Sequence, residues 1–419
     1  MSDADGPFDV VIWGATGFTG RLTAAHLLQH LGPDGGGVRW AIAGRSADKL
    51  EEVAREISAS TGVDAGGIAR VIADADDETS LRALVERARV VCTTVGPYAK
   101  YGSKLVALCA ETGTDYCDLT GEVQWMRRMI DAHEAAARAS GARIVHNCGF
   151  DCIPSDLGVW FTQREAAARF GAPSPHVKLR VASFSGGVSG GTAASMMELV
   201  EEATRDPGVR KLMADPYGLN PEGARSGPDG GDQRGAVYDD DFGEWTAPFV
   251  MAGINTRVVR RTNALTDSRY GADFRYDEAV LCGAGPGGFA KAAGQAVGQG
   301  AMMGAMAIGP LRRLSARALP APGEGPSKKT REEGFYVLRL HASPPPGVEA
   351  PALRATVKGD MDPGYGSTSK MLGQAALCLA EGGAKVGGGF FTPAAAMGDA
   401  LIERLEKHAG LSFEVEAES

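Results

Sequence analysis

Two cysteines, two aspartates and a serine fall within nine positions in the stretch CGFDCIPSD, residues 148–156. Zinc sites use four ligands, commonly as Cys-x-x-Cys pairs, whereas three residues separate Cys148 from Cys152 and only His146 lies nearby. A nucleophilic cysteine would need a positioned base. We therefore predict no metal site and interpret the stretch as a turn between a strand and a helix.

Side chains of this turn could still line a binding site. Gly149 would take the bend, and the next helix would begin near Pro154, because proline favours the first helical turn. If the turn follows a parallel strand, that helix points its N-terminus at the crevice along the carboxyl edge of the sheet. We then expect Asp151 to be a catalytic candidate and Phe150 and Ser155 to contact the substrate.

A glycine-rich turn follows the first apolar run of the chain. VVIW leads directly into GATGFTG, with glycines at Gly-x-x-Gly-x-x-Gly spacing before a helix. In dinucleotide sites these glycines allow the tight turn, the backbone approach to a pyrophosphate and the packing of helix on strand. A turn without a ligand is the alternative, but the flanking strand and helix favour a cofactor site. The candidate cofactor-binding residues are Gly14, Ala15, Thr16, Gly17, Phe18, Thr19 and Gly20.

The end of the second strand indicates which nicotinamide cofactor binds. NAD-selective sites place Asp or Glu there to hold the ribose 2′-hydroxyl, whereas this chain has Arg45 and Ser46 in the sequence AGRS. A guanidinium and a hydroxyl suit the dianionic 2′-phosphate, although a solvated arginine is the alternative. We predict NADPH, with Asp74 meeting the adenine edge.

The first 147 residues alternate between short apolar runs and amphipathic helical runs. Six strands separated by five helices predict an α/β fold with a doubly wound parallel Rossmann sheet. The expected strands cover 8–13, 38–43, 68–73, 89–95, 115–119 and 143–147.

The pattern changes after residue 155. A helix is expected at 155–169, a long irregular loop at 214–245 that could be mobile, and closing helices at 366–383 and 392–410. The expected strands cover 176–186, 256–265, 274–280, 334–343 and 353–360. This half predicts a second, mixed domain of α/β (α+β) type.

Composition and charge exclude some partners. The chain has 43 Lys and Arg against 52 Asp and Glu, a net charge of −9, without a basic cluster, so we expect no nucleic acid partner. Seven cysteines and an N-terminus without basic and long apolar regions favour reduced thiols in the cytoplasm. Residues 279–311 are apolar but mostly Gly and Ala. We therefore expect a helix that is buried, or that lies on a membrane or lipid surface, rather than a helix that spans a membrane.

The motifs occur in an order typical of one family. GATGFTG, AGRS, TTVGPYAKYG (93–102), DLTGE (118–122) and CGFDCIPSDLG (148–158) resemble those of saccharopine dehydrogenase-like oxidoreductases, most closely the trans-acting enoyl reductase branch. The resemblance continues to GGGFFTPAAAMGD (387–399) and covers nearly the whole chain. It implies hydride transfer to an activated C=C of a lipid or polyketide acyl chain, carried by a synthase partner without its own enoyl reductase.

The resemblance also implies three parts of the chain. Residues 1–155 would form the NADP-binding Rossmann domain, 156–361 a substrate or dimerisation domain, and 362–419 helices that return to the Rossmann domain. A homodimer is the corresponding expectation for a partner. The composition of 279–311, rather than the resemblance, gives the expectation of a peripheral membrane contact.

Enoyl reduction needs a hydride at the β-carbon, stabilisation of the enolate oxygen and a proton for the α-carbon. Gly96 and Pro97, after the fourth strand, should bind the nicotinamide-ribose side of the cofactor. Tyr98 is a catalytic candidate and Tyr101 a substrate-binding one, although water could supply the proton. We interpret Glu122 as a cap of the helix that follows it.

Two other functions remain open from the residues. A saccharopine-type reductase would act on an amino-acid imine adduct with several carboxylates, so its pocket should hold convergent arginines. The arginines of the second half mostly stand in polar or strand-edge contexts, which argues against that substrate. A non-catalytic nucleotide-binding protein on a lipid surface is the third reading.

Overall fold

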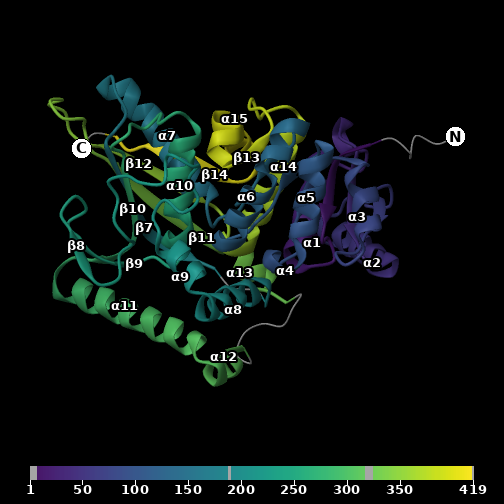
Figure 1. Ribbon diagram of the computed structural model, residues 1–419, viewed down its shortest axis with the longest axis horizontal. Coiled ribbons are helices and arrows are strands. Elements are labelled where there is room, and N and C mark those ends of the chain that lie inside the picture. Colours follow the sequence, from purple (N-terminus) through teal and green to yellow (C-terminus); the bar gives the residue numbers. More distant parts are fainter. Residues whose placement is uncertain (1–6, 187–189, 317–323, 418–419) are drawn as a thin grey trace.

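Two seven-stranded sheets organise the protein. The computed structural model describes residues 7–186, 190–316 and 324–417 (Figure 1). The first sheet has the strand order β13-β6-β5-β4-β1-β2-β3, and the second has the order β14-β12-β11-β7-β10-β9-β8. The predicted fold, a Rossmann-type sheet with a second mixed α/β domain, is confirmed.

The first sheet is parallel throughout, and its apolar strands are buried because helices cover both faces. Its first six strands are β1 (Phe8–Trp13), β2 (Trp40–Gly44), β3 (Ala69–Ile72), β4 (Ala88–Thr93), β5 (Asp115–Cys117) and β6 (Arg143–Val145). The helices between them are α1 (Phe18–Leu31), α2 (Ala47–Thr61), α3 (Glu78–Val85), α4 (Tyr98–Tyr101), α5 (Ser103–Thr112) and α6 (Val123–Ser140). All six predicted strands are therefore present, in the predicted parallel arrangement.

The C-terminal segment returns to this sheet. Helix α14 (Thr368–Ala380) packs on α1, β1, β4 and β5, and β13 (Gly389–Phe391) pairs in parallel with β6 as a seventh strand. The chain then leaves again, because α15 (Pro393–His408) packs on α7 and β14 (Leu411–Val415) pairs with β12 of the second sheet. Residues 362–417 thus contact both sheets, and the division at residues 155 and 361 stays a prediction.

The second sheet is mixed. Strand β7 pairs in parallel with β10, and the other neighbours are antiparallel. Its remaining strands are β7 (His176–Ser185), β8 (Val237–Asp239), β9 (Glu244–Pro248), β10 (Arg275–Gly283), β11 (Phe335–Ala342) and β12 (Leu353–Gly359). The associated helices are α7 (Ile153–Phe170), α8 (Gly190–Arg205), α9 (Pro207–Ala214), α10 (Ala252–Leu265), α11 (Gly285–Ala307), α12 (Gly309–Ala316) and α13 (Lys328–Glu332).

One predicted strand is wrong. Residues 256–265 belong to helix α10, which is buried along most of its length. The outward polar stripe that marks most surface helices is missing here, because even Arg257, Arg260 and Arg261 are buried. Without that stripe, the β-branched residues of the segment suggested a strand.

The buried arginines of α10 hold the loop that precedes β8. Arg257 forms an ion pair with Asp232, and Arg260 Nε donates to Asp229 Oδ2 at 2.6 Å. Arg261 donates to the Leu219 carbonyl, and burial lowers the pKa of its guanidinium to about 10. A charged group that is buried and then deprived of its partner is strongly destabilising. The loop expected to be mobile is therefore anchored at three points.

Helix α11 runs along the lower edge of the molecule in Figure 1, with α12 at its end. It packs on β9, β10 and α8. Among the residues that the structure describes, no helix is long and apolar enough to cross a membrane.

Candidate active site

The glycine turn has the geometry that a bound pyrophosphate requires. Gly14 adopts φ +93°, and a Cβ there would lie 2.7 Å from Val95 Cγ2, so only glycine fits. A Cβ on Gly20 would overlap the Gly14 carbonyl oxygen, so the third glycine lets α1 pack against the strand end. Gly17 N donates to Gly14 O at 2.9 Å and Arg21 N donates to Gly17 O at 3.1 Å. The N–H groups of the first turn of α1, at Phe18, Thr19 and Gly20, precede that second bond and can donate to phosphate oxygens.

The predicted 2′-phosphate residues lie at the same edge of the sheet. Arg45 is exposed directly after β2, and none of the ion pairs between described residues involves it. Ser46 caps α2, where its Oγ accepts Lys49 N–H at 3.4 Å. Asp74 follows β3 and accepts the Asp76 N–H at 3.1 Å. A free guanidinium beside a helix N-terminus fits a phosphate.

Glu122 holds the loop after β4. Its carboxylate oxygens accept the backbone N–H groups of Tyr98 and Ala99, each at 2.8 Å. Glu122 therefore caps α4 across the crevice, whereas the interpretation of its side chain as a cap of the following helix α6 is wrong. Burial raises the pKa of the Glu122 carboxyl.

Tyr98 is a buried structural link rather than a free phenol. Its hydroxyl donates to the Thr93 carbonyl at 3.2 Å and accepts the Leu119 N–H at 3.1 Å, which ties the ends of β4 and β5 together. The ring stacks on Trp125, with centroids 5.5 Å apart. Burial, with the charge of Asp118 second, raises the pKa of the phenol well above its usual range. Both hydroxyl contacts are made within the protein, which makes Tyr98 a poor proton donor, and its assignment as a catalytic residue stays a prediction.

An apolar cavity of about 380 Å³ opens beside the glycine turn. One end is lined by residues from the carboxyl edge of the first sheet, namely Thr19, Thr94, Gly96, Tyr98, Leu119, Gly121, Glu122 and Val123. Its apolar walls come from the second half of the chain and include Met196, Leu199, Val200, Met213, Met251, Ile254 and Met303. The two halves together form a site in which a cofactor and an apolar substrate could meet.

Asp151 reaches this cavity. Burial raises the pKa of its carboxyl to about 6. Among the described residues that line the cavity, the carboxylates are Asp151 and Glu122, and no Lys, Arg or His is present. Since Glu122 is occupied by backbone N–H groups, Asp151 is the lining carboxyl available for proton transfer.

The other predicted substrate residues point elsewhere. Phe150 packs its ring on Tyr336 with centroids 4.8 Å apart, and Ser155 Oγ accepts Asn255 Nδ2–H at 3.1 Å inside a buried polar network. Tyr101 is 39% exposed at the end of α4. None of the three is among the residues that line the cavity, and their contact with the substrate stays a prediction. Pro97 precedes α4 beside the lining residue Gly96.

The turn after β6 bends at a residue that the sequence did not single out. Asn147, not Gly149, adopts a left-handed φ of 65°. A Cβ on Gly149 would lie 2.7 Å from Leu119 Cδ2, so this glycine permits close packing. The Asp118 carboxylate supports the bend, because it accepts the N–H of Asn147 at 3.1 Å and contacts His146 Nδ1 at 2.7 Å. In the sequence, the position of Asp118 in the motif DLTGE, at the end of a buried strand, was the signal that could have indicated this support.

The cysteines of this turn are packing groups. Cys148 and Cys152 are buried and unpaired, as predicted. Within the described part of the chain, no group of three or more His, Cys, Asp or Glu side chains could hold a metal ion.

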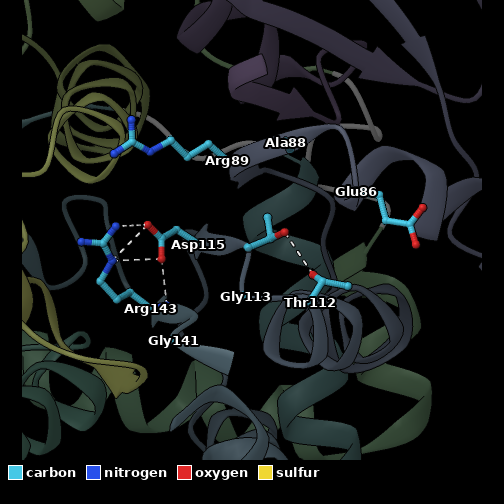
Figure 2. Close-up of a pocket in the computed structure, with 9 residues that line it drawn as sticks. Glu86, Ala88, Arg89, Thr112, Gly113, Asp115, Gly141 and Arg143 are labelled. Atoms are coloured by element: carbon cyan, nitrogen blue, oxygen red, sulfur yellow. Dashed lines mark hydrogen bonds and ion pairs between the residues drawn. The ribbon is translucent and has the colours of Figure 1, made fainter. Parts of the chain in front are cut away.

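A second cavity, of about 420 Å³, lies at the opposite edge of the first sheet. Figure 2 shows Asp115 and Arg143 turned toward each other there, with the Arg89 side chain extending nearby. Arg143 Nε contacts both Asp115 carboxylate oxygens at 3.0 Å. Because ligands of open α/β sheets bind at the carboxyl ends of the strands, this amino-end cavity is separate from the candidate active site.

Comparison with known proteins identifies the family. The chain is 44% identical, over 97% of both chains, to a Mycobacterium tuberculosis protein named as a candidate trans-acting enoyl reductase. It is 41% identical, again over 97% of both chains, to the trans-acting enoyl reductase of Mycobacterium bovis (strain BCG / Pasteur 1173P2). The protein belongs to the trans-acting enoyl reductase family.

The cofactor-binding part of the chain also matches a known family. A family described as Saccharopine dehydrogenase NADP binding domain matches residues 10–145. The apo saccharopine dehydrogenase (L-Glu forming) of Saccharomyces cerevisiae superimposes with a TM-score of 0.51 over 97% of this chain and 99% of that one, at 14% identity, which shows a shared fold. The predicted family, the NADP cofactor and the oxidoreductase class are confirmed.

Proposed function

We propose that the protein reduces the activated C=C of an acyl thioester with NADPH, in trans to a synthase that carries the growing lipid or polyketide chain. The names of its relatives support the reaction type and the partner. The cavity supports the substrate class, because methionine and aliphatic side chains line it beside the glycine turn. This contact between an apolar chamber and the cofactor edge is the observation that carries the proposal.

The site residues divide the work. NADPH, when bound, supplies the hydride, which adds to the β-carbon and shifts the C=C electron pair toward the thioester oxygen. Glu122 and Tyr98 fix the loop after β4, so that Gly96 and Thr94 form a fixed wall of the cavity that would hold the nicotinamide. Asp151 then gives its proton to the α-carbon and becomes a carboxylate. An acid with a pKa near the working pH suits this transfer.

The saccharopine-type alternative lacks support from the cavity. A substrate with several carboxylates calls for converging cations, and the described lining residues include none. The arginines of α10 that could have supplied them are engaged with Asp229, Asp232 and backbone carbonyls.

NADPH oxidation by the purified full chain tests the function. Enoyl thioesters of increasing chain length should be reduced, and an imine formed from an amino acid and a keto acid should not. Tight NADPH binding without turnover of any enoyl substrate would favour the non-catalytic reading instead.

Three statements about partners and place remain proposals. These are the synthase partner, a homodimer, and a lipid contact through residues 279–311. A cytoplasmic location likewise stays a prediction from the sequence.

A further inference from the structure

Helix α11 and the start of α12 expose an unusual number of apolar side chains. One side of α11 is buried through Ala292 and Met306 against the second sheet and α8. On the open side, Val297 is 72% exposed and Ile308 is 53% exposed. The larger exposed apolar residues of this surface are Phe289, Val297, Met302, Met303, Ile308 and Leu311, which we call the α11 face.

This face lacks the charges that normally solvate an outward helix. Lys291 is the single charged residue in the 23 residues of α11. Surface helices usually carry charged residues opposite the core, and an exposed apolar patch marks a site of interaction. Some partner should therefore cover the α11 face.

Charge indicates which partner fits. Residues 285–312 contain Lys291 and Arg312 and no Asp or Glu, although the whole chain has a net charge of −9. Arg312 pairs with Glu201 of α8 at 3.1 Å, so part of this charge is neutralised within the protein. A two-fold contact between two copies would bring the same cations together. An anionic lipid surface would attract them while it receives the apolar side chains.

Met303 links this surface to the candidate active site. It is exposed on the α11 face and also lines the apolar cavity. Helix α8, which supplies Met196 and Leu199 to the cavity wall, packs directly on α11. The mouth of the cavity is therefore continuous with the α11 face.

We propose that the α11 face docks in the plane of an anionic lipid bilayer and that acyl substrates enter the cavity past Met303. The docking stands on the exposure and charge of this surface. The entry route also rests on the proposed function, since it takes the cavity as the acyl site.

Vesicle co-sedimentation of the full chain tests the docking without any turnover. Wild-type protein should bind vesicles that contain phosphatidylglycerol and bind pure phosphatidylcholine vesicles at least tenfold more weakly. Val297→Glu and, separately, Ile308→Glu should each weaken binding at least tenfold. Val415→Glu is the matched control, because it places the same charge on an exposed valine of β14, at the opposite edge of the second sheet from α11, and should leave binding unchanged.

Other outcomes overturn the docking proposal. No binding of wild type to anionic vesicles would do so, as would equal losses in Val297→Glu and Val415→Glu. A lipid-free dimer that Val297→Glu converts to a monomer, without vesicle binding, would assign the face to a second copy. Capture of an acidic acyl carrier protein by this face in place of vesicles would assign it to the carrier.

A second assay separates the entry route from the enzyme reaction. Val297→Glu should reduce a short, water-soluble enoyl thioester at the wild-type rate but lose at least tenfold in rate with a long-chain enoyl substrate held in anionic vesicles. Equal rates with vesicle-borne substrate would refute the entry route. Failure of wild type with both substrates would instead refute the proposed function and leave the vesicle-binding result standing.

Discussion

The carboxylate of Glu122 accepts the backbone N–H of Tyr98 at 2.8 Å, although 24 residues separate the two along the chain. The second carboxylate oxygen accepts the neighbouring Ala99 N–H, also at 2.8 Å. Through Tyr98, whose hydroxyl bridges Thr93 and Leu119, the loops after β4 and β5 become one unit. This unit lines one end of the cavity, so the shape of that end depends on the Glu122 carboxylate.

Replacement of Glu122 should therefore disturb stability and positioning together. Glu122→Ala leaves two N–H groups without their acceptor, and we expect a loss of about 2–4 kcal/mol in the free energy of unfolding. Glu122→Gln keeps one acceptor oxygen and should recover part of that loss. Urea denaturation measures both variants, with the exposed Glu111→Ala as control. Equal stability of Glu122→Ala and Glu111→Ala would show that the Glu122 cap of α4 does not stabilise the protein.

Asp151 should control the pH dependence of the reaction. A proton donor works in its acid form, so kcat/KM should fall as pH rises through about 6, the raised pKa of this carboxyl. Asp151→Asn should lower kcat by roughly 10²–10⁴-fold and remove that dependence. NADPH affinity, measured by fluorescence titration, should stay unchanged. An unaltered pH profile in Asp151→Asn would assign the proton to water or to another group.

The Asp151 carboxyl should also affect the folding stability. A salt-bridged carboxylate stabilises the folded state when it ionises, whereas ionisation of Asp151 should destabilise it. Because burial raises its folded-state pKa from 3.8 to about 6, ionisation costs more in the folded chain than in the unfolded chain. The folded state is therefore progressively penalised between pH 4 and 6, by up to about 3 kcal/mol above that range. Asp151→Asn should melt higher than wild type at pH 7.5 and equally at pH 3.5. A variant that melts lower at pH 7.5 would contradict this origin of the pKa.

Arg45 should separate NADPH from NADH. Its guanidinium is free at the carboxyl end of β2, where the 2′-phosphate would lie, so Arg45→Ala should weaken NADPH binding by roughly tenfold to a hundredfold. NADH binding should change little. Arg55→Ala, an exposed arginine farther along α2, is the control and should affect neither cofactor. An equal loss for both cofactors would contradict the assignment.

Gly14 and Gly62 offer a matched pair for the cofactor turn. Both have positive φ, +93° and +74°, but a Cβ on Gly14 would clash with Val95 and Thr94, whereas one on Gly62 meets nothing within 4 Å. Gly62→Ala should cost only the backbone strain, about 1–2 kcal/mol. Gly14→Ala should add the clash and abolish measurable NADPH binding. Retained NADPH binding in Gly14→Ala would mean that the cofactor does not approach this turn.

The sequence predicted the first sheet well because its signals are local. Buried parallel strands appear as continuous apolar runs, and GATGFTG marks the first turn through backbone constraints that a few glycines reveal. The strand β13 could not be predicted in the same way, since its three residues gain their partner, β6, from more than 240 positions away. The strand predicted at residues 256–265 was wrong for a related reason. The polar side chains of helix α10 form hydrogen bonds and ion pairs with a distant loop rather than with water.

The sequence predicted which backbone segments form the site better than it predicted where their side chains point. Position after a strand indicated which segments meet at the carboxyl edge, and Asp151 and Gly96 do line the cavity. The direction of a side chain within a turn depends on which residue takes the bend. With Asn147 in the left-handed conformation, Phe150 and Ser155 turn toward the second sheet and α10 instead of the cavity.

Steady-state NADPH oxidation with matched enoyl and imine substrates tests the central claim most directly. We predict turnover of enoyl thioesters, with kcat/KM rising as the acyl chain lengthens to fill the apolar cavity. Met213→Trp, which narrows that cavity, should then lower kcat/KM for long chains more than for a four-carbon chain. Turnover of a polycarboxylate imine in preference to every enoyl thioester, unaffected by Met213→Trp, would contradict it.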